Sequence, residues 1–404
     1  MKEHDTSRAF AIALCYAGMV CLAAAVNLLP IFLTTVRTEF GGNGGLNAEQ
    51  LGRIGGVTFA GLVLGILMAG PLADRWGGRL FSILGSALVA FGLGTLGIAP
   101  DYTLLLAAAF IMGLGAGILD MVLSPIVAAL QPLRRSSALN WLHSFYAMGC
   151  VITVIISMLA LRAGIGWRAI SISLATVPLL VALGFSRLNL PPLTSAEQCT
   201  RTTLKDLCAN ILFQATALAI FLGGALELGM AQWLPAYAEM SLGFSKSTGS
   251  FALLAFSAAM ALGRILAGKF GAHIEPITLM LSCCWSSVIM FLLACFAPWP
   301  TVALGASIGL GLAGSCLWPT TLGLAANHFP QGGASMFGVM AALGNLGGLL
   351  MPWLVGVTAD RSSLRLGLAT SIVCPLLMVL VLVWLRRRTP AEPPEARSSV
   401  PQTA

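Results

Sequence analysis

Twelve apolar segments, each about as long as a bilayer is thick, take up nearly the whole of this 404-residue chain. A run of about 20 apolar residues spans a bilayer as a helix. Open strands leave backbone groups unpaired in lipid, and the segments lack the alternation of a barrel. We therefore predict an all-α membrane protein with spans at 10–36, 51–73, 80–99, 103–131, 137–161, 168–187, 210–237, 249–268, 277–297, 301–326, 334–358 and 364–385.

The charges indicate how these spans are oriented. Charged residues make up only 9% of the chain, against about 25% in soluble domains. With both termini in the cytoplasm, Lys and Arg fall mainly in cytoplasmic segments, as the positive-inside rule requires; examples are Arg134, Arg135, Arg386, Arg387 and Arg388. The net charge of +7 thus reports topology, and we expect no nucleic-acid partner. Short loops without a glycosylation sequon favour a bacterial inner membrane.

The chain divides into two halves of six spans. We predict an N-terminal half at 1–187, a cytoplasmic linker at 188–209, a C-terminal half at 210–388 and a disordered tail at 389–404. The halves repeat weakly, since Leu72-Ala-Asp-Arg-Trp-Gly77 aligns with Leu266-Ala-Gly-Lys-Phe-Gly271. In transporters built from such repeats, the substrate lies near mid-membrane between the halves.

A charged turn, Gly70-Pro-Leu-Ala-Asp-Arg-Trp-Gly-Gly-Arg79, separates the second and third spans. An aspartate at a cytoplasmic turn can cap a helix of the other half or meet an arginine. We interpret the turn as part of a cytoplasmic gate that favours an outward-open state; a plain topology-determining loop is the alternative. The predicted gate residues are Gly70, Asp74, Arg75, Gly77, Arg79, Arg134, Arg135 and, on the eighth span, Arg264.

Two carboxyl groups, Asp120 and Glu227, lie deep inside spans. An ionisable group at mid-membrane costs about 2.5–3.5 kcal/mol on insertion scales and by default marks function. Gly113, Gly117, Asp120 and Ser124 share one helix face, which we expect to line a cavity. Both carboxyl groups are candidates for proton coupling, because low solvation favours the protonated form. A carboxyl group that is satisfied structurally by a neighbouring helix is the alternative.

The seventh span carries a candidate solute site around Glu227. Three glycines and Pro235 make this helix breakable, and unwound helices border transporter sites. Gln232, Trp233 and Tyr237 would offer an amide and flat aromatic faces, which suit a polyol. An aromatic belt at the membrane interface is the alternative for the two rings.

Further pore candidates lie on other spans. Asn140 and His143 share a face of the fifth span, although the nearby Arg134 and Arg135 place them close to the cytoplasm. In the second half, Trp318 and Asn345 are candidates as well.

The motifs resemble those of a known family. The 70–79 turn resembles the G-x-L-A-D-R-x-G-R-K loop of the major facilitator superfamily. A closer resemblance, over about 10–385, is to the fucose–galactose–glucose:proton symporters. It rests on four motifs: G-x-G-x-x-[ED]-x-x-x-[NS]-P in helix 4, L-N-x-x-[QH] in helix 5, G-A-x-E-x-G-x-x-x-W-L-P-x-Y in helix 7 and Gly263-Arg264 in helix 8. The resemblance implies that Asp120 is the proton-coupling carboxylate, that Glu227 is the acidic position of helix 7, and that Asn140 and His143 lie near the sugar.

The chain departs from that family at two positions. Val26 stands where its helix-1 aspartate is expected, with only Asn27 nearby, and Ser124 replaces an asparagine. The resemblance therefore does not identify the sugar. Uniport of a sugar, without a proton, stays an alternative.

We expect a monomeric importer of a small polar solute, a neutral monosaccharide, together with a proton. Proton-coupled antiport of drugs is the nearest alternative, although the antiporters' helix-4 arginine and helix-5 G-P-x-x-G-G pattern are missing. No catalytic motif argues for an enzyme. The ten cysteines show no metal-ligand spacing, so we expect no metal and no cofactor.

Overall fold

The computed structural model describes residues 2–131, 135–188, 190, 204–270, 274–329 and 333–388. Within these residues, twelve helical segments are long and apolar enough to cross a membrane, which confirms the predicted all-helical fold. The predicted tail at 389–404 and most of the predicted linker lie outside the described residues, and the end of that linker forms a short helix.

The helices of the N-terminal half are α1 (Lys2–Ile31), α2 (Leu33–Phe40), α3 (Ala48–Trp76), α4 (Gly78–Ile98), α5 (Tyr102–Leu130), α6 (Arg135–Arg162) and α7 (Trp167–Ser186). Those that follow are α8 (Leu204–Ala209), α9 (Ile211–Ala231), α10 (Leu234–Met240), α11 (Lys246–Phe270), α12 (Pro276–Phe296), α13 (Pro300–Gly314), α14 (Leu317–His328), α15 (Gly333–Arg361), α16 (Leu364–Ala369) and α17 (Val373–Arg388).

Four of the predicted spans are interrupted, the twelfth by a 3-10 turn at Thr370–Ile372 between α16 and α17. The first breaks at Phe32, after Pro30, and the tenth at Ser315–Cys316. The seventh breaks at Gln232–Trp233, and Pro235 then lies in the first turn of α10, where its missing N–H costs no hydrogen bond. Proline at a helix start thus sets the break in the seventh span, whereas the glycines expected to weaken it lie inside the continuous helix α9.

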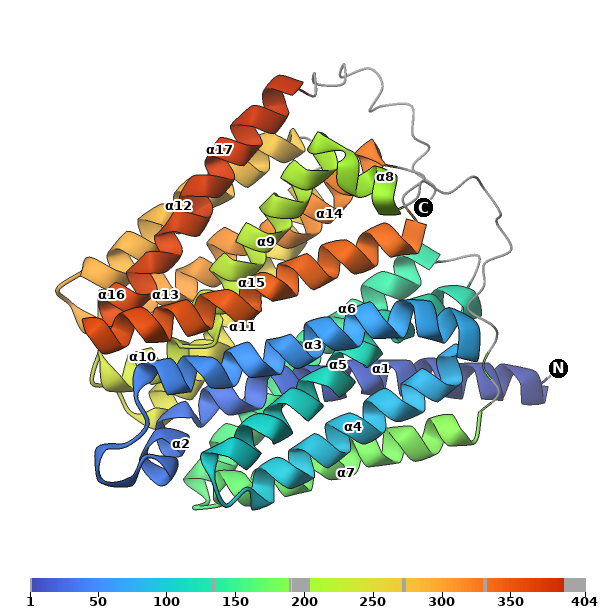
Figure 1. The fold of residues 1–404 in the computed structure, drawn as a ribbon, viewed down its shortest axis with the longest axis horizontal. Helices are drawn as coiled ribbons and strands as arrows, with labels where there is room; N and C mark the ends of the chain where they lie inside the picture. Colours follow the sequence, from blue (N-terminus) through green and yellow to red (C-terminus); the bar gives the residue numbers. More distant parts are fainter. Residues whose placement is uncertain are drawn as a thin grey trace.

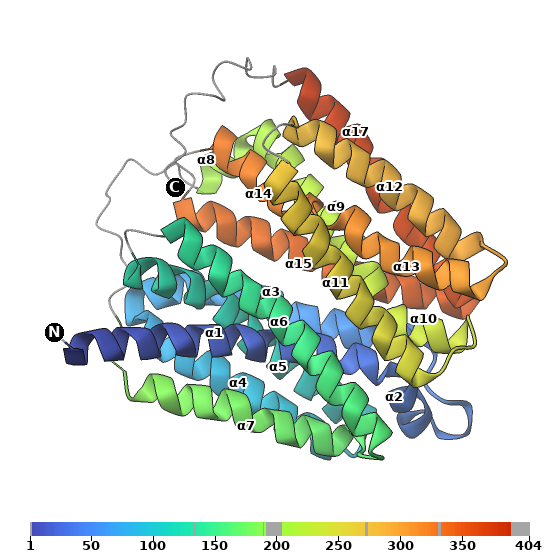
Figure 2. The same ribbon diagram turned by 180° about the vertical axis from the view of Figure 1, so that it is seen from behind.

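The two halves lie side by side and meet along two helix pairs. In Figures 1 and 2, α1 to α7 occupy the lower part and α9 and α12 to α17 the upper part. Helix α3 lies against α15, and α6 against α11. We call the end that carries the N-terminus the inner end, because the sequence predicts that it is cytoplasmic. The outer end carries α2, α10 and α16.

At the outer end, α2 is hydrogen-bonded to the other half. Thr34 Oγ1 donates to Glu239 Oε2 at 2.7 Å, and Lys246 Nζ donates to Thr35 Oγ1 at 2.8 Å. Glu239 lies beyond the predicted seventh span. Burial raises the pKa of the Glu239 carboxyl above its ordinary value, opposed by the Thr34 hydrogen bond and the Lys246 charge.

Helix α3 is also held from the other half at its outer end. The backbone N–H groups of Ala48 and Glu49 donate to the two oxygens of Asp360, at 2.6 and 2.8 Å. Trp353 Nε1 donates to Glu49 Oε1 at 2.6 Å. A carboxylate at a helix N-terminus satisfies free backbone donors and meets the positive end of the helix dipole. The outer ends of the two halves are therefore joined.

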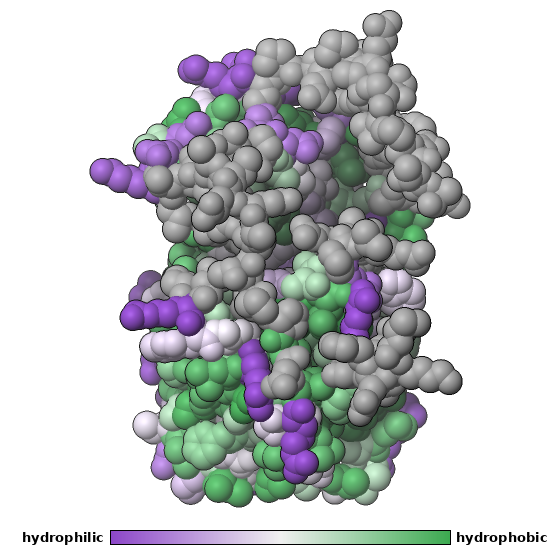
Figure 3. All heavy atoms as spheres, turned by 90° about the vertical axis from the view of Figure 1, so that its right-hand side faces the viewer, coloured by the Kyte–Doolittle hydropathy of each residue, from purple (hydrophilic) through white to green (hydrophobic). Residues whose placement is uncertain are grey.

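The inner end differs in shape. Figure 3 looks onto this end and shows a hollow between the upper and lower parts. This recess opens toward the predicted cytoplasmic side. The molecule is therefore closed at its outer end and hollowed at its inner end.

Candidate functional site

An ion pair in the C-terminal half joins one predicted coupling residue to one predicted gate residue. Arg264 Nη2 on α11 lies 3.5 Å from Glu227 Oε2 on α9. Their side chains are 39% and 18% exposed, so neither is fully enclosed by the packed helices. Arg264 Nε also donates to the Ser315 carbonyl oxygen at 3.3 Å. The break between α13 and α14 supplies that carbonyl.

A polar cluster of the N-terminal half lies opposite. Asn27 Nδ2 donates to Cys150 Sγ at 3.1 Å and to the Ala23 carbonyl at 2.9 Å. Tyr146 lies close to Asn27 and Cys150 and within range of the Glu227 charge. The Glu227–Arg264 pair thus faces α1 and α6 of the other half.

Sequence reasoning missed Tyr146 and Cys150. Both follow the predicted residue His143 on α6, at spacings of three and seven residues, and so share its helix face. The signal was therefore present. That signal is the helical spacing from His143 along the same span. A tyrosine among apolar residues does not by itself indicate a binding site.

Asp120, the second predicted coupling residue, lies on α5, partly buried. His143 on α6 lies close enough for the two charges to interact, and its side chain is exposed. Ser124, one turn further along α5, is partly buried. The N-terminal half therefore also pairs an acid with a potential cation.

The prediction that Gly113 and Gly117 of α5 line a cavity is wrong. A methyl group on Gly113 would overlap the Thr58 carbonyl oxygen, and one on Gly117 would overlap that of Leu62. Both glycines therefore pack against the backbone of α3. Close helix approach through small residues, and not solute access, accounts for them.

The structure places the three polar and aromatic candidates after Glu227 in packed positions. Trp233 is 1% exposed, and its Nε1 donates to the Pro352 carbonyl at 2.9 Å. Tyr237 is fully buried, and its hydroxyl donates to the Ala294 carbonyl. Gln232 is 8% exposed and lies next to Gly55 of α3. In this conformation neither ring offers an open face to a solute, and neither lies in a lipid belt.

The remaining candidates of the second half are partly buried. The Trp318 ring packs over the backbone of Gly344 and against Gly224. Asn345 Nδ2 donates to the Ala341 carbonyl of its own helix at 3.0 Å. Trp318 therefore packs α14 against α9 and α15.

The predicted gate turn lies at the inner end, between α3 and α4. Gly77 has φ +87°, a conformation that glycine adopts without strain. Arg79 donates to the Ser186 carbonyl, Arg75 is exposed, and Gly70 lies next to Met121. Asn140 and Arg135 belong to α6, but their side chains, that of Asp74 and all of Arg134 lie outside the described residues.

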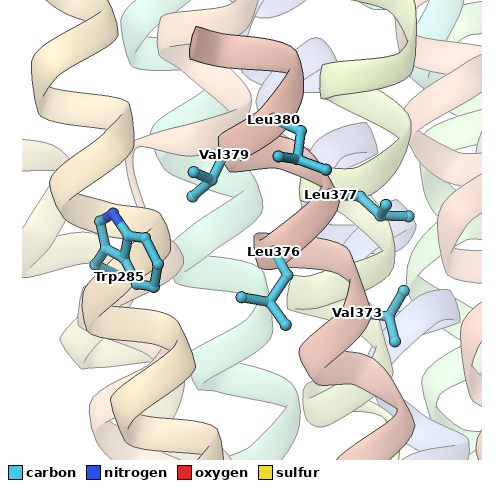
Figure 4. Close-up of a pocket in the computed structure, with 6 residues that line it drawn as sticks. All are labelled: Trp285, Val373, Leu376, Leu377, Val379 and Leu380. Atoms are coloured by element: carbon cyan, nitrogen blue, oxygen red, sulfur yellow. The ribbon is translucent and has the colours of Figure 1, made fainter.

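A groove on the surface of the helix bundle, between α12 and α17, is not part of this site. Trp285 of α12 and five aliphatic side chains of α17 line it, as Figure 4 shows; these are Val373, Leu376, Leu377, Val379 and Leu380. Most of them are exposed, and every lining group is apolar apart from the indole N–H. Such a surface suits lipid chains and offers little to a polar solute.

Comparisons with known proteins agree with this geometry. The sequence model of the Major Facilitator Superfamily matches residues 14–284 and 240–403. The chain is 25% identical over 380 residues to the cis,cis-muconate transport protein of Acinetobacter baylyi, covering 80% of this chain and 89% of that protein. It is 23% identical over 395 residues to a putative niacin/nicotinamide transporter of Bacillus subtilis, covering 94% and 96%.

Solved structures share the fold. A bacterial homologue of the human lysosomal transporter Spinster, inward-facing and unoccupied, gives a TM-score of 0.77 at 16% identity, covering 95% of this chain and 99% of that one. A fucose:proton symporter in its outward conformation gives 0.64 at 20% identity, covering 95% and 100%.

Proposed function

The chain belongs to the Major Facilitator Superfamily, and we propose that it imports a small polar solute together with a proton by alternating access. Membership makes it a multi-pass membrane protein and a secondary transporter, not an enzyme. The superfamily part of the sequence resemblance is thus confirmed. The matched relatives carry varied solutes by name, so the choice of solute and the coupling to a proton belong to the proposal.

One observation carries the proposal: each half holds a carboxyl group beside a basic side chain. Glu227 pairs with Arg264, and Asp120 interacts with His143. A charge without a partner deep in the membrane is costly. Protonation of the carboxyl group therefore changes the electrostatic energy of each pair strongly. Protonation on one side of the membrane and release on the other would then accompany the change of conformation.

Uptake into proteoliposomes tests the coupling. With an inside-alkaline pH gradient, we expect the wild type to accumulate its solute. Asp120→Asn and Glu227→Gln should each abolish gradient-driven accumulation, while exchange between preloaded sides persists in at least one of them. Asp101→Asn is the matched control, because Asp101 caps α5 at the outer end, far from the recess, and asparagine caps equally well. Full accumulation in both site variants would contradict proton coupling by these residues.

The solute class has two candidates. The motif resemblance implies a neutral monosaccharide, for which Asn27, Ser124 and Gln232 would offer amide and hydroxyl groups. Two relatives are named for cis,cis-muconate and for niacin or nicotinamide, which favours a compound bearing a carboxylate or a related amide. Labelled glucose, galactose and fucose test the first class. Outward movement of a drug against a proton would identify an exporter and overturn the proposed direction.

A further inference from the structure

Arg264 is the side chain that separates the two solute classes. A carboxylate solute needs a cationic partner in its binding site, whereas a neutral sugar can bind without one. Resting on the proposed function, we infer that the solute is a small organic carboxylate. It binds to the Arg264 guanidinium when Glu227 takes up a proton, so that proton and anion cross together.

The geometry leaves Arg264 available for a second carboxylate. An N⁺–H···O⁻ bond is commonly about 2.7–2.9 Å long, and Arg–carboxylate pairs are frequently bidentate. Here Arg264 Nη2 and Glu227 Oε2 are 3.5 Å apart, and Nε donates to a backbone carbonyl instead. The guanidinium is held by its Nε while 39% of the side chain remains exposed. It is therefore both positioned and reachable.

Charge balance links the anion to the proton. While Glu227 is ionised, the pair with Arg264 is neutral, and an added carboxylate would meet the repulsion of Glu227. When a proton from water in the recess binds the Glu227 carboxylate, Arg264 is left with an unbalanced charge. A carboxylate of the solute restores neutrality and fits the planar fork of the guanidinium. Release of both on the other side of the membrane re-forms the original pair.

The groups that face this pair fit the same solute. Tyr146 and Cys150 of α6, and Cys316 in the break just before α14, lie within range of one or both charges. None of them can carry a positive charge that would replace Arg264 as the anion's partner. The Tyr146 hydroxyl can donate to a solute oxygen from the opposite half, which would let one ligand contact both halves.

The coupling predicts the electrical character of transport. One proton moving with one monocarboxylate carries no net charge, whereas one proton moving with a neutral sugar carries one positive charge. A membrane potential therefore distinguishes the two classes directly.

Two matched pairs of probes test the inference with the full-length protein in liposomes. Each pair keeps the ring and changes its charge: D-glucuronate with D-glucose, and nicotinate with nicotinamide. Uptake is measured under an inside-alkaline pH gradient, and again with an inside-negative potassium diffusion potential added. Protein-free liposomes give the passive entry to be subtracted.

We expect a carboxylate probe to accumulate with the pH gradient and its uncharged partner to enter at least about tenfold more slowly, a ratio worth 1.4 kcal/mol. The membrane potential should not change the uptake of the carboxylate probe. Accumulation of an uncharged probe, accelerated by the potential, would overturn the carboxylate inference and keep the proposed function. Carboxylate entry that ignores the pH gradient would keep the solute class and overturn proton coupling. No accumulation of any probe would count against both.

Variants assign the effect to Arg264. Arg264→Gln should lose carboxylate uptake, and Arg264→Lys should retain it with a KM raised about tenfold, because lysine keeps the charge and loses the fork. Glu227→Gln should bind nicotinate with an affinity that no longer changes with pH, which a merely structural role would not produce. Arg168→Gln is the matched control, since Arg168 pairs with Glu39 at 2.7 Å outside the recess and should retain uptake. Wild-type uptake in Arg264→Gln would overturn the inference.

Discussion

Helix α3 contains two stretches of close glycine contact that differ in their partner. At its outer part, methyl groups on Gly52 and Gly56 would meet the backbone of α15, in the other half. Further in, methyl groups on Gly61 and Gly65 would meet the backbone of α5, in the same half. The chemistry is the same in both, since small residues let backbones approach closely. Only the outer stretch joins the two halves.

The difference shows which close contacts must separate during transport. If the halves rock, the α3–α15 contact at the outer end has to open, whereas the α3–α5 contact stays intact. The outer contact is also reinforced by polar bonds, with Asp360 bonded to the first turn of α3. The tripeptide Ala-Asp-Arg occurs at the outer end of α15, residues 359–361, and again at the inner end of α3, residues 73–75. The sequence therefore repeats an aspartate–arginine pair near a helix end on each side of this helix pair.

The largest effect is expected from Gly52→Ala. In the closed outer end, the added methyl group overlaps the Pro352 carbonyl oxygen. Overpacking of this kind costs about 1–3 kcal/mol, and the cost disappears once α3 and α15 separate. We expect the population to shift toward outward-open states. Distances between spin labels at Thr103 and Trp299, on the outer ends of the two halves, would lengthen.

Gly117→Ala is the matched control for Gly52→Ala. Its methyl group would overlap the Leu62 carbonyl oxygen within the N-terminal half. Because that contact persists in every state, the variant should lower the thermal stability and leave the distance distribution unchanged. Equal distance shifts in both variants would break the distinction between the two glycine stretches.

Asp360→Ala should have the next largest effect. It removes two hydrogen bonds from backbone N–H groups of α3 that join the halves. Losing a helix N-cap costs about 1–2 kcal/mol, which corresponds to a 5–30-fold change in an equilibrium. The same labels should report more outward-open protein. Arg361→Ala changes the adjacent charge only, and a similar shift in that variant would contradict the role of Asp360.

The fold was predictable because bilayer thickness fixes the length of a hydrophobic helix. All twelve segments correspond to spans in the structure. The breaks were harder to place, since proline marks a helix start only to within a turn. Pro235 predicted an interruption of the seventh span, and the structure places it three residues earlier, at Gln232.

The sequence singles out the two acids of the candidate site, and of the side chains beside them it singles out only His143 as a solute-site residue. Asp120 and Glu227 stand out because a carboxylate in an apolar run is rare. Their neighbours come from other helices: Arg264 was assigned to the gate from its place in the chain, and Tyr146 was not singled out. Trp233 and Tyr237 show the converse problem. An aromatic ring gives the same sequence signal whether it faces a solute or a backbone carbonyl, and here both polar atoms bind carbonyls.

Glu239→Gln should remove a pH dependence of the outer closure. In the closed state, burial raises the pKa of Glu239, whereas an opened outer end would return it to water and to its ordinary value. The closed state therefore binds the proton more tightly. It is favoured at a pH below the ordinary pKa and loses that advantage as the pH rises through the raised value.

Glutamine mimics the protonated form and can still accept from Thr34, so Glu239→Gln should keep the outer end closed across that pH range. Label distances recorded from pH 5 to pH 9 would test this. A wild type that closes more at high pH would contradict the assigned sign.

Trp353→Phe should give the smallest change. It removes the indole N–H that donates to Glu49 Oε1 across the two halves and keeps an aromatic ring against α3. Glu49 retains its ion pair with Arg53, so its carboxylate stays partnered. One exposed hydrogen bond contributes about 0.5–1 kcal/mol, which predicts a shift of a few-fold at most toward outward-open protein. An effect as large as that of Asp360→Ala would mean that the Trp353 contact, and not the bonds at the α3 N-terminus, holds the outer ends together.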